Sequence, residues 1–321
     1  MNISIKFYQL NHRSLWDEFC YKNRGVDFTY QRRYLEYRNN EINDKSLIFE
    51  DNDTGKLCGV FPLAMPDSKS RVVVSHPYLT FGGCIVSKEI DIFTYLELLE
   101  KALCQLTSEG FIALRYRCRP TIYESVLSVA AEYMLTRRHG STVNLNLSSI
   151  IKLKQENTSS SRRTRALKKA SKSNLSIRKL DSDLSLFWRT LECEIAERYN
   201  SKLVHTYNDF TNIRTSFSEN ILCYGVFSSE RLISGAIIYV YSNVWKLQYS
   251  FSTIEGRNLN AIDWLYSNLL KKARSLGFEY FDFGTSNNGN EMFSIQRGLF
   301  EFKMGFGCSL STYRTLEVPL K

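Results

Sequence analysis

The chain lacks the residue patterns that metal sites and disulfide frameworks require. Its eight cysteines contain no CxxC pair, and its four histidines are scattered along 321 residues. Zinc sites use closely spaced cysteine and histidine ligands, and disulfide frameworks belong mainly to small secreted domains. The sequence therefore predicts no metal site and no disulfide scaffold. We expect Cys104, on an apolar helix face, and Cys223, in an apolar strand, to be small core residues.

Long hydrophobic runs are also absent. The longest apolar stretches, such as residues 233–241, are far shorter than the ~20 residues of a membrane helix. The first residues alternate as a strand does and lack the apolar region of a signal peptide. We therefore expect a cytoplasmic protein with no transmembrane segment. A hydrophobic content of 43% excludes a disordered chain, and the length suits about two domains.

Positive charge is concentrated in one segment. Residues 151–180 hold ten Lys and Arg and one acidic residue, which gives this segment the same net charge, +9, as the whole chain. A Ser-rich stretch within it offers an N-cap for a basic helix over residues 161–172. One face of this helix carries Arg162, Arg165, Lys169 and Lys172, and another carries Ala166, Leu167 and Ala170, which can dock on the protein.

Three interpretations of the basic helix stay open. It is a solvated surface, a phosphate-binding surface for a nucleotide-linked or lipid-linked substrate or for CoA, or a general nucleic-acid patch. No aromatic residues are interleaved in the helix and no DNA-binding motif surrounds it, so we expect no DNA partner.

The same order of elements occurs twice, as hairpin, strand, helix and strand. The first copy comprises residues 47–61, 72–78, 92–106 and 111–117, and the second comprises 222–241, 244–252, 262–276 and 278–283. The segments LLEKALCQLTSEGFIALRY and LLKKARSLGFEYFDF also read alike. This order predicts an α+β fold of two like domains with mixed sheets, over residues 1–150 and 151–321.

The last fifth of the chain places two ionisable residues among phenylalanines. Asp282 ends a strand over residues 278–283, and Lys303 lies in a second expected strand over residues 299–303. Buried ionisable groups need a partner and often mark a site, so either a structural ion pair or a functional pair fits. The Asp-Phe-Gly triplet is not that of a protein kinase, because no HRD loop precedes it and no glycine-rich phosphate loop is present.

Several motifs resemble those of the Fem-type and Fem-like acyltransferases, a branch of the GNAT superfamily built from two GNAT-like domains. They are FDFGTS at 281–286, GLFEFK at 298–303, Phe306-Gly307, the basic helix and strand from 162 to 177, and the turn from His76-Pro77-Tyr78 to Gly82-Gly83. The resemblance implies two tandem GNAT-like domains, each a mixed β-sheet flanked by helices. The first is a degenerate domain on the acceptor side, and the second carries the basic helix and the catalytic motifs.

The resemblance also implies catalytic roles. Lys303 matches a family lysine that stabilises developing negative charge, and Asp282 orients this lysine or accepts a proton from the acceptor. His205 aligns with a histidine of many relatives, and an imidazole that titrates near 6.5 suits a base. A single histidine more often has a structural role, and this alternative stays open.

Substrate contacts follow from the same resemblance. His76 and Tyr78 belong to the turn on the acceptor side, and the loop from Thr285 and Ser286 to Asn290 shapes the acceptor pocket. Arg162, Arg165 and Lys169 of the basic helix bind a phosphate-bearing substrate.

The donor site is expected where a strand leads into a helix, over residues 252–260. Arg257 could meet a phosphate there, and Asn258 and Asn260 could cap the helix. The glycine-rich signature of the superfamily is absent, so an ordinary helix cap fits as well. Some Fem-type relatives use aminoacyl-tRNA in place of acyl-CoA, and both donors stay open.

Taken with the resemblance, the sequence predicts an N-acyltransferase. It would move an acyl group from acyl-CoA to an amine of a phosphate-bearing cell-envelope or polysaccharide precursor, such as a nucleotide-linked amino sugar or a lipid-linked acceptor. One alternative is an aminoacyl-tRNA-dependent aminoacyltransferase that builds peptidoglycan bridges. An alternative of another class is a protein that binds an anionic glycan precursor or RNA without turnover.

Overall fold

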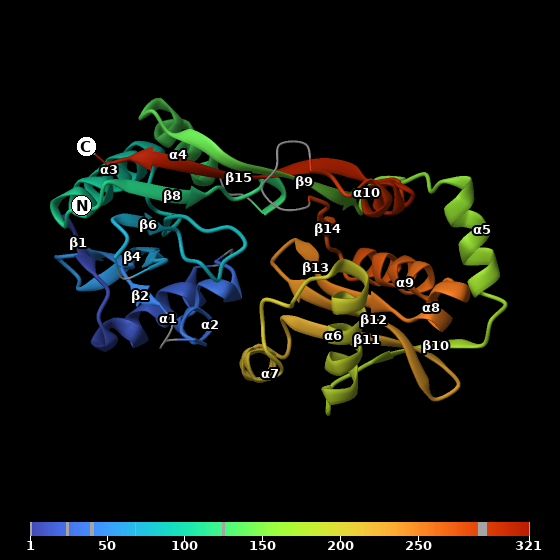
Figure 1. Cartoon of the computed structure of the whole chain (residues 1–321). Coiled ribbons are helices and arrows are strands. Elements are labelled where there is room, and N and C mark those ends of the chain that lie inside the picture. Colours follow the sequence, from blue (N-terminus) through green and yellow to red (C-terminus); the bar gives the residue numbers. More distant parts are fainter. Residues whose placement is uncertain are drawn as a thin grey trace. The chain divides into compact units, whose positions relative to one another are not determined.

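The computed structural model describes residues 2–23, 26–38, 42–67, 69–123, 126–287 and 294–320 (Figure 1). The chain divides into two compact units, which we treat separately: unit 1 is Met1–Asn146 with Thr312–Lys321, and unit 2 is Leu147–Ser311. Strands β9 (Ser141–Lys152) and β15 (Ser309–Pro319) each begin in one unit and end in the other. The expected division gave residues 312–321 to the second half, whereas they are counted with unit 1 because β15 pairs with β8 there.

Unit 1 contains two sheets. One is an antiparallel sheet of order β1-β3-β4-β7, and the other has the order β15-β8-β6-β5-β2, in which β6 and β8 are parallel. The expected hairpin around Gly55 is confirmed as β3 and β4. The elements are β1 (Ile3–Phe7), α1 (Arg13–Lys22), α2 (Arg32–Leu35), β2 (Asn43–Asp44), β3 (Leu47–Asp51), β4 (Lys56–Phe61), β5 (Ala64–Met65), β6 (Val72–Val74), β7 (Ile85–Val86), α3 (Ile92–Ser108), β8 (Ala113–Arg117) and α4 (Val126–Arg137).

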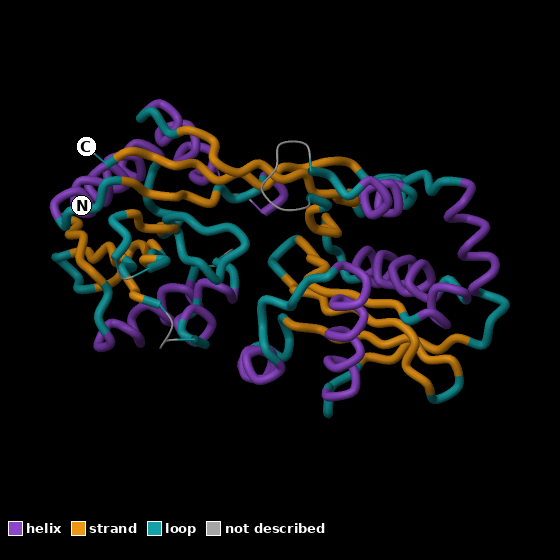
Figure 2. Tube along the Cα trace, in the orientation of Figure 1, coloured by secondary structure: helices purple, strands orange, loops and turns teal. Residues whose placement is uncertain are grey.

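The strands of unit 2 follow the order β10-β11-β12-β13-β14-β9 in a mixed sheet that, among the described residues, continues from β9 into β15. From β10 to β9 all neighbours are antiparallel except β13 and β14, which are parallel. In Figure 2 helices lie along these strands. The elements are α5 (Ser161–Ala170), β10 (Leu175–Lys179), α6 (Ser185–Tyr199), α7 (Tyr207–Ser216), β11 (Ile221–Ser228), β12 (Arg231–Val240), β13 (Val244–Ser252), α8 (Ile254–Asn258), α9 (Ala261–Ser275), β14 (Tyr280–Thr285) and α10 (Arg297–Met304).

The two units share one arrangement. In each, a helix separates two strands that pair in parallel: α3 comes between β6 and β8, and α9 between β13 and β14. A parallel pair needs such a crossover connection. The predicted α+β fold with the same helix–strand order in both halves is confirmed. Unit 1 departs from the expectation in one respect, since its hairpin β3–β4 lies in a separate sheet from β6.

One predicted element is wrong. Residues 299–303 were expected to form a strand, but they belong to helix α10, and Lys303 therefore lies on a helix. The phenylalanines here recur at a spacing that also suits a helical face. Phe302 and Phe306 both pack on Tyr266 of α9, with ring centroids 6.1 and 5.8 Å away. Packing on α9 therefore decides between two patterns that the sequence left equivalent.

The two cysteine predictions have opposite outcomes. Cys223 is buried in β11, as expected, whereas Cys104 is exposed on α3. The buried face of α3 runs through Tyr95, Leu99 and Leu103. Cys104 follows Leu103 and therefore points away from that face.

Unit 2 buries both faces of its central strands. Ala236 and Ile238 of β12 lie in the same core cluster as Leu265 and Leu269 of α9. The alternate residue Gly235 approaches Phe187 of α6 so closely that an added Cβ would lie 2.4 Å from the ring. Successive strand residues point to opposite faces, so α9 and α6 cover opposite faces of β12.

Gly235→Ala should destabilise the protein by about 1–3 kcal/mol, because the new methyl group must displace the rings of Phe187 and Phe251 in a packed core. Chemical denaturation measures the loss. Gly298→Ala is the matched control: nothing lies within 4 Å of its added Cβ, so stability should hold or rise slightly. Equal effects of the two substitutions would contradict this account of the core.

Candidate active site in unit 2

The parallel strands β13 and β14 part after three residue pairs. Their register runs from Val244↔Tyr280 to Lys246↔Asp282 and then stops. β14 continues beside β9, with Thr285 opposite Ser148. β13 continues to Ser252 beside β12 alone. Beyond Lys246, one edge of β13 therefore has backbone donors and acceptors that no strand pairs with in the described part of the chain, and a ligand can bind along such an edge.

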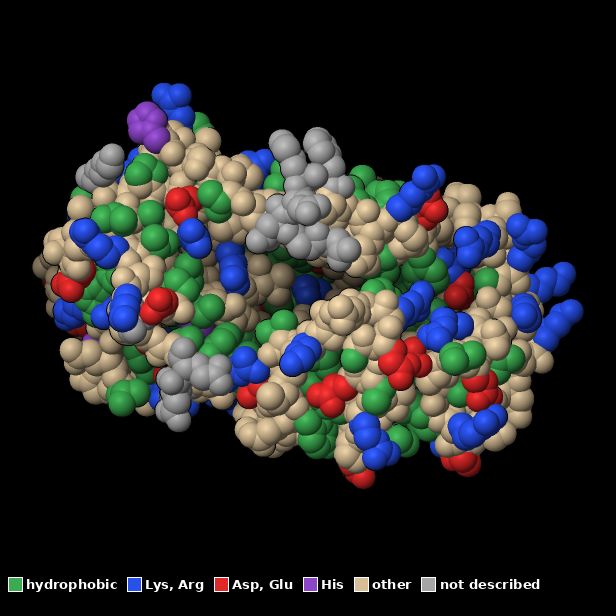
Figure 3. All heavy atoms as spheres, viewed as in Figure 1, with side chains coloured by type: hydrophobic (Ala, Val, Ile, Leu, Met, Phe, Trp, Pro, Cys, Tyr) green, Lys and Arg blue, Asp and Glu red, His purple; other side chains and the backbone are tan. Residues whose placement is uncertain are grey.

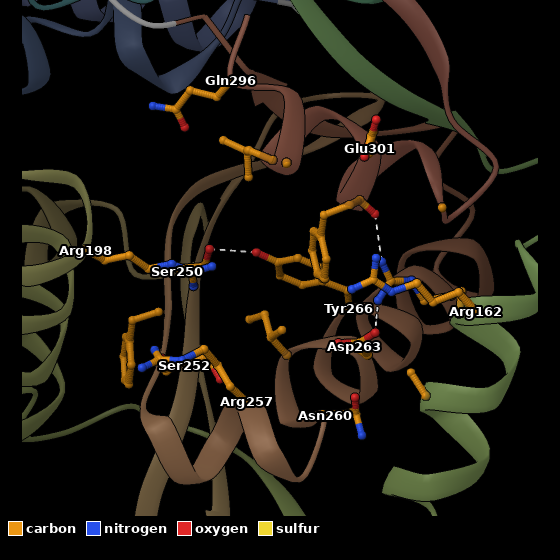
Figure 4. A pocket seen from close by; sticks show the side chains of 18 of the residues that line it. Arg162, Arg198, Ser250, Ser252, Arg257, Asn260, Asp263, Tyr266, Gln296 and Glu301 are labelled. Carbon is orange, nitrogen blue, oxygen red and sulfur yellow. Dashed lines mark hydrogen bonds and ion pairs between the residues drawn. The ribbon is translucent and has the colours of Figure 1, made fainter.

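A pocket of about 960 Å³ opens at this free edge. Ser250, Phe251 and Ser252 of β13 line it, together with residues of α5, α6, α9 and α10. Figure 4 shows Ser250, Ser252 and Arg257 on one side, Arg162, Asp263 and Asn260 on the other, and Tyr266 between them. The Tyr266 hydroxyl donates to Ser250 Oγ at 2.6 Å, so the inner wall of the pocket is fixed by a hydrogen bond between α9 and β13.

The pocket is basic. Its lining includes seven basic and three acidic side chains, and each acid is paired with an arginine: Asp263 with Arg163, Glu194 with Arg257, and Glu301 with Arg297. Among the described residues no carboxylate pairs with the other four cations, which are Arg162, Arg165, Lys169 and Arg198. Figure 3 shows Lys and Arg side chains gathered over the region where α5 lies. These four cations make the pocket suitable for an anionic ligand.

The structure thus brings together two groups of predicted residues. The basic residues Arg162, Arg165 and Lys169 line the same pocket as Arg257 and Asn260 of the expected donor segment. The predicted helix is confirmed as α5, with Ser160 as its N-cap. Ala170 is buried as expected, but the helix also docks through Arg163, which the sequence analysis did not single out.

Arg163 connects α5 to two other helices. Its guanidinium forms a buried ion pair with Asp263 of α9 and donates to the carbonyl oxygen of Phe302 in α10 at 2.7 Å. It also lies over the rings of Phe302 and Phe306, 4.2 and 3.9 Å from their centroids. A planar cation suits both the stacking and the ion pair. Arg163 therefore positions the basic helix and is not available for a ligand.

The donor segment differs from the expectation in detail. Residues 254–258 form the short helix α8, so Asn258 ends a helix and is absent from the residues that line the pocket. Asn260 occupies the N-cap position of α9 in a left-handed conformation, but its side chain makes no capping hydrogen bond. Arg257 pairs with Glu194 of α6 and donates to the carbonyl oxygen of Ser252. Arg257 thus already has two protein partners.

The predicted residue Asp282 lies at the last rung of the parallel pair. It is fully buried and accepts hydrogen bonds at Oδ1 from Ser148 Oγ at 2.6 Å and from the Gly284 amide at 2.7 Å. These donors fix the carboxylate, an arrangement that suits orienting a neighbour better than exchanging protons with substrate.

Lys303 reaches the same place from α10. Its ammonium donates to the carbonyl oxygens of Gly284 and Thr285, at 2.9 and 2.7 Å. The side chain is buried, and burial lowers the pKa of Lys303 to about 8, an effect that Asp282 opposes. Lys303 does not line the basic pocket, although its neighbours Phe302 and Gly305 do.

Through Tyr249 and a β-bulge in β13, His205 lies on the same face of the sheet as Lys246 and Asp282. Its Nδ1 lies 2.7 Å from the hydroxyl of Tyr249 in β13. Lys246 pairs with Tyr239 and Tyr249 with Ile237, because the register shifts between them. Tyr239 and Ile237 share a face of β12, so Tyr249 and Lys246 share a face of β13. Tyr249 therefore holds His205 on the face that carries Lys246 and its register partner Asp282.

The remaining predicted residues lie elsewhere. His76 belongs to unit 1, where it is fully buried beside Tyr78, with ring centroids 5.5 Å apart. Burial lowers the pKa of His76 to about 3, so this imidazole is neutral at physiological pH. In unit 2, Ser286 Oγ is buried without a hydrogen-bond partner among the described residues, next to Thr285. Residues 288–290 of the expected acceptor loop lie outside the described residues.

Comparisons with known proteins define the class of fold. No protein-family model matches the chain, and no curated protein matches it significantly. A crystal structure of FemX covers 97% of this chain and 96% of its own, at 14% identity and a TM-score of 0.68. The C-terminal domain of a putative lysylphosphatidylglycerol synthetase from Agrobacterium fabrum covers 96% of this chain and 92% of its own, at 10% identity and a TM-score of 0.63.

A tandem GNAT protein from the clavulanic acid biosynthesis pathway is also similar. It covers 99% of both chains, at 8% identity and a TM-score of 0.51. The chain therefore has the tandem GNAT-like fold of Fem-type proteins, as the motifs predicted. Across the described ranges no helix is both long and apolar enough to span a membrane, and no cluster of three or more metal-ligating side chains occurs.

Arg163→Met should cost about 3–5 kcal/mol of stability, because it leaves Asp263 buried without its cation. Denaturant titration checks this against Arg162→Met, an exposed neighbour whose loss should change stability by at most about 0.5 kcal/mol. The double variant Arg163→Met/Asp263→Leu should be more stable than Arg163→Met alone, since it buries no unpaired charge. A double variant no more stable than the single one would argue against the ion pair as the anchor of α5.

Proposed function

We propose that the protein is an acyltransferase that binds a phosphate-bearing acyl donor in the unit 2 pocket. The observation that carries this proposal is the parting of β13 and β14 beside a pocket in which four lining cations pair with no carboxylate among the described residues. An extended carrier with amide groups can hydrogen-bond to the free edge of β13. Its anionic groups can then meet Arg162, Arg165, Lys169 and Arg198.

Acyl-CoA fits this description. Its arm contains amides for the strand edge, and its phosphates suit the basic wall. The pocket volume of about 960 Å³ is at the upper end of the ~300–1,000 Å³ usual for small-molecule sites. The 3′ end of an aminoacyl-tRNA is the second candidate donor, because exposed basic residues continue beyond the pocket and past the end of α5 to Lys172.

We assign the acyl-transfer chemistry to Lys303, Asp282 and His205, near the point where β13 and β14 part. Acyl transfer to an amine needs stabilisation of a tetrahedral oxyanion and removal of a proton from the acceptor. Lys303, held by two carbonyl oxygens, supplies a preorganised cation for the oxyanion. Asp282 orients the cluster, and His205, held by Tyr249, is the candidate base. Ser286, whose buried hydroxyl has no hydrogen-bond partner among the described residues, and Thr285 contribute to the acceptor pocket.

The acceptor is proposed to be an amine on a phosphate-bearing cell-envelope or polysaccharide precursor, either nucleotide-linked or lipid-linked. Unit 1, with His76 and Tyr78, is assigned to the acceptor side on the strength of the Fem-like motif. Because His76 is neutral and buried, it would shape this side rather than bind an anion directly. Such precursors and both candidate donors are cytoplasmic compounds, so we propose a cytoplasmic location for the protein.

A protein that only binds an anionic glycan precursor or RNA is the alternative of another class. The basic pocket alone would serve such a binder. A buried lysine and a buried aspartate at the strand split have no use in it beyond structure, so turnover by the wild type decides between the two.

Removal of the pocket cations tests the donor site. The variant Arg162→Ala/Arg165→Ala/Lys169→Ala should weaken binding of CoA, or of an aminoacyl-tRNA, by about 1.4–2.8 kcal/mol, which is tenfold to a hundredfold in Kd. Calorimetry at low and high salt measures this, and the difference should shrink as salt shortens the Debye length to ~3 Å at 1 M.

The matched control removes equal charge from the same segment outside the pocket: Lys168→Ala/Lys172→Ala/Lys179→Ala. It should bind CoA nearly as the wild type does, because none of its three positions lines the pocket. Equal losses of affinity in both triple variants would show that binding depends on overall charge and not on the pocket. If the wild type bound neither donor, the proposed donor site would be refuted.

Lys303→Met should lower turnover by on the order of 10²-fold or more while changing donor binding much less. In the wild type, kcat should fall as pH rises through about 8, because an oxyanion needs the protonated lysine and the pKa of Lys303 is about 8. Lys303→Arg, which stays protonated, should lose this alkaline limb while remaining slower, since a planar fork replaces a point charge. A folded Lys303→Met variant with near-normal kcat would rule out the role.

A further inference from the structure

A second lysine lies at the strand split. Lys246 of β13 is buried, only 6% exposed, and its ammonium donates to Gln248 Oε1 at 2.6 Å. Taking an ammonium out of water costs several kcal/mol unless another charge compensates it. A buried lysine with a neutral amide as its hydrogen-bond acceptor therefore calls for a carboxylate nearby.

That carboxylate is Asp282. Lys246 and Asp282 are register partners in the last rung before the strands part, so their side chains project from the same face. Burial lowers the pKa of Lys246. The negative charge of Asp282 raises it, but by less, so the net shift is downward.

The same carboxylate also serves Lys303. The two carbonyl oxygens that hold Lys303 belong to Gly284 and Thr285, just beyond Asp282 in the chain. Asp282 raises the proton affinity of Lys303 while Lys246 lowers it. The other titratable group facing Lys303 is Cys308, whose pKa burial raises to about 12, so this thiol is uncharged at neutral pH. Two buried amines thus face one carboxylate.

We propose that Lys246 is a positioning residue that sets the protonation state of Lys303, because the two amines compete for the single charge of Asp282. When both are protonated the cluster carries an uncompensated buried positive charge, and like charges at short range disfavour one another. Release of one proton relieves this. Burial is the largest cause that lowers the pKa of Lys303 to about 8, and Lys246 adds to this effect, so at physiological pH the ammonium is still the main form but can give up its proton.

The inference concerns one link within the proposed function, and its first test is independent of activity. Titration of the intact protein with ¹³C-labelled lysine side chains, followed by NMR, reports the midpoint of each buried lysine, and Lys303→Arg and Lys246→Arg assign the two signals. In the wild type the two curves should be mutually dependent, with broadened or two-step transitions. Two independent single-step curves would overturn the inference without any variant of Lys246 having to fold.

The second test removes the competing charge. Lys246→Met, similar in volume and uncharged, should raise the Lys303 midpoint by on the order of one pH unit, whereas Lys246→Arg should leave it near the wild-type value. Lys271→Met, which removes an exposed lysine of α9, should have no effect. An unchanged midpoint in folded Lys246→Met would refute the inference.

Kinetics then separate the inference from the function on which it rests. In Lys246→Met the alkaline limb of kcat should move up by the same interval as the Lys303 midpoint, with KM for the donor unchanged. A shifted midpoint with an unmoved limb would support the coupling while removing Lys303 from the rate-limiting step. A buried lysine that served only packing would change stability and leave both the midpoint and the limb in place.

Discussion

The parting of β13 from β14 after Lys246↔Asp282 is the constraint on which the site depends. Had β14 stayed paired with β13, the strand edge that lines the pocket would be filled. The split leaves carbonyl oxygens without a ladder partner, and buried carbonyls must find one elsewhere. Lys303 donates to two of them, at Gly284 and Thr285. The residue assigned to the oxyanion thus also satisfies two backbone carbonyl oxygens of β14 beyond the split.

Helix α5 shows how one basic segment can combine two uses. Arg163 gives up its solvation to bind Asp263 and to stack on two phenylalanines, and this fixes the helix. Its neighbours Arg162 and Arg165 stay exposed at the pocket wall. A rigid helix costs less entropy when it binds a ligand than a mobile basic tail would. The buried arginine therefore contributes to binding although no ligand touches it.

The sequence predicted those elements whose hydrophobic period is unambiguous. β13 was predicted with its observed bounds, and the hairpin β11–β12, helix α5 and helix α9 within a few residues. It failed where two periods coincide, as in α10, and where a contact joins distant segments. Nothing local distinguishes Arg163 from Arg162, since burial of the first depends on Asp263 a hundred residues away. The β-bulge that places Tyr249 on the same face as Lys246 has no signature in the sequence. The position of His205 on the face that carries Asp282 could therefore not be predicted.

The path of the chain through unit 1 bears on how the protein folds. The core of unit 1 includes Leu316, Val318 and Leu320, which arrive after all of unit 2 has been synthesised, and β15 covers an edge of β8. During synthesis, unit 2 is completed as one continuous stretch, whereas one edge of β8 in unit 1 stays unpaired until β15 has been made. Exposed edges are prone to pair with other chains. Removal of the last ten residues would therefore harm the half of the protein that begins the chain, and would favour aggregation over a clean loss of activity.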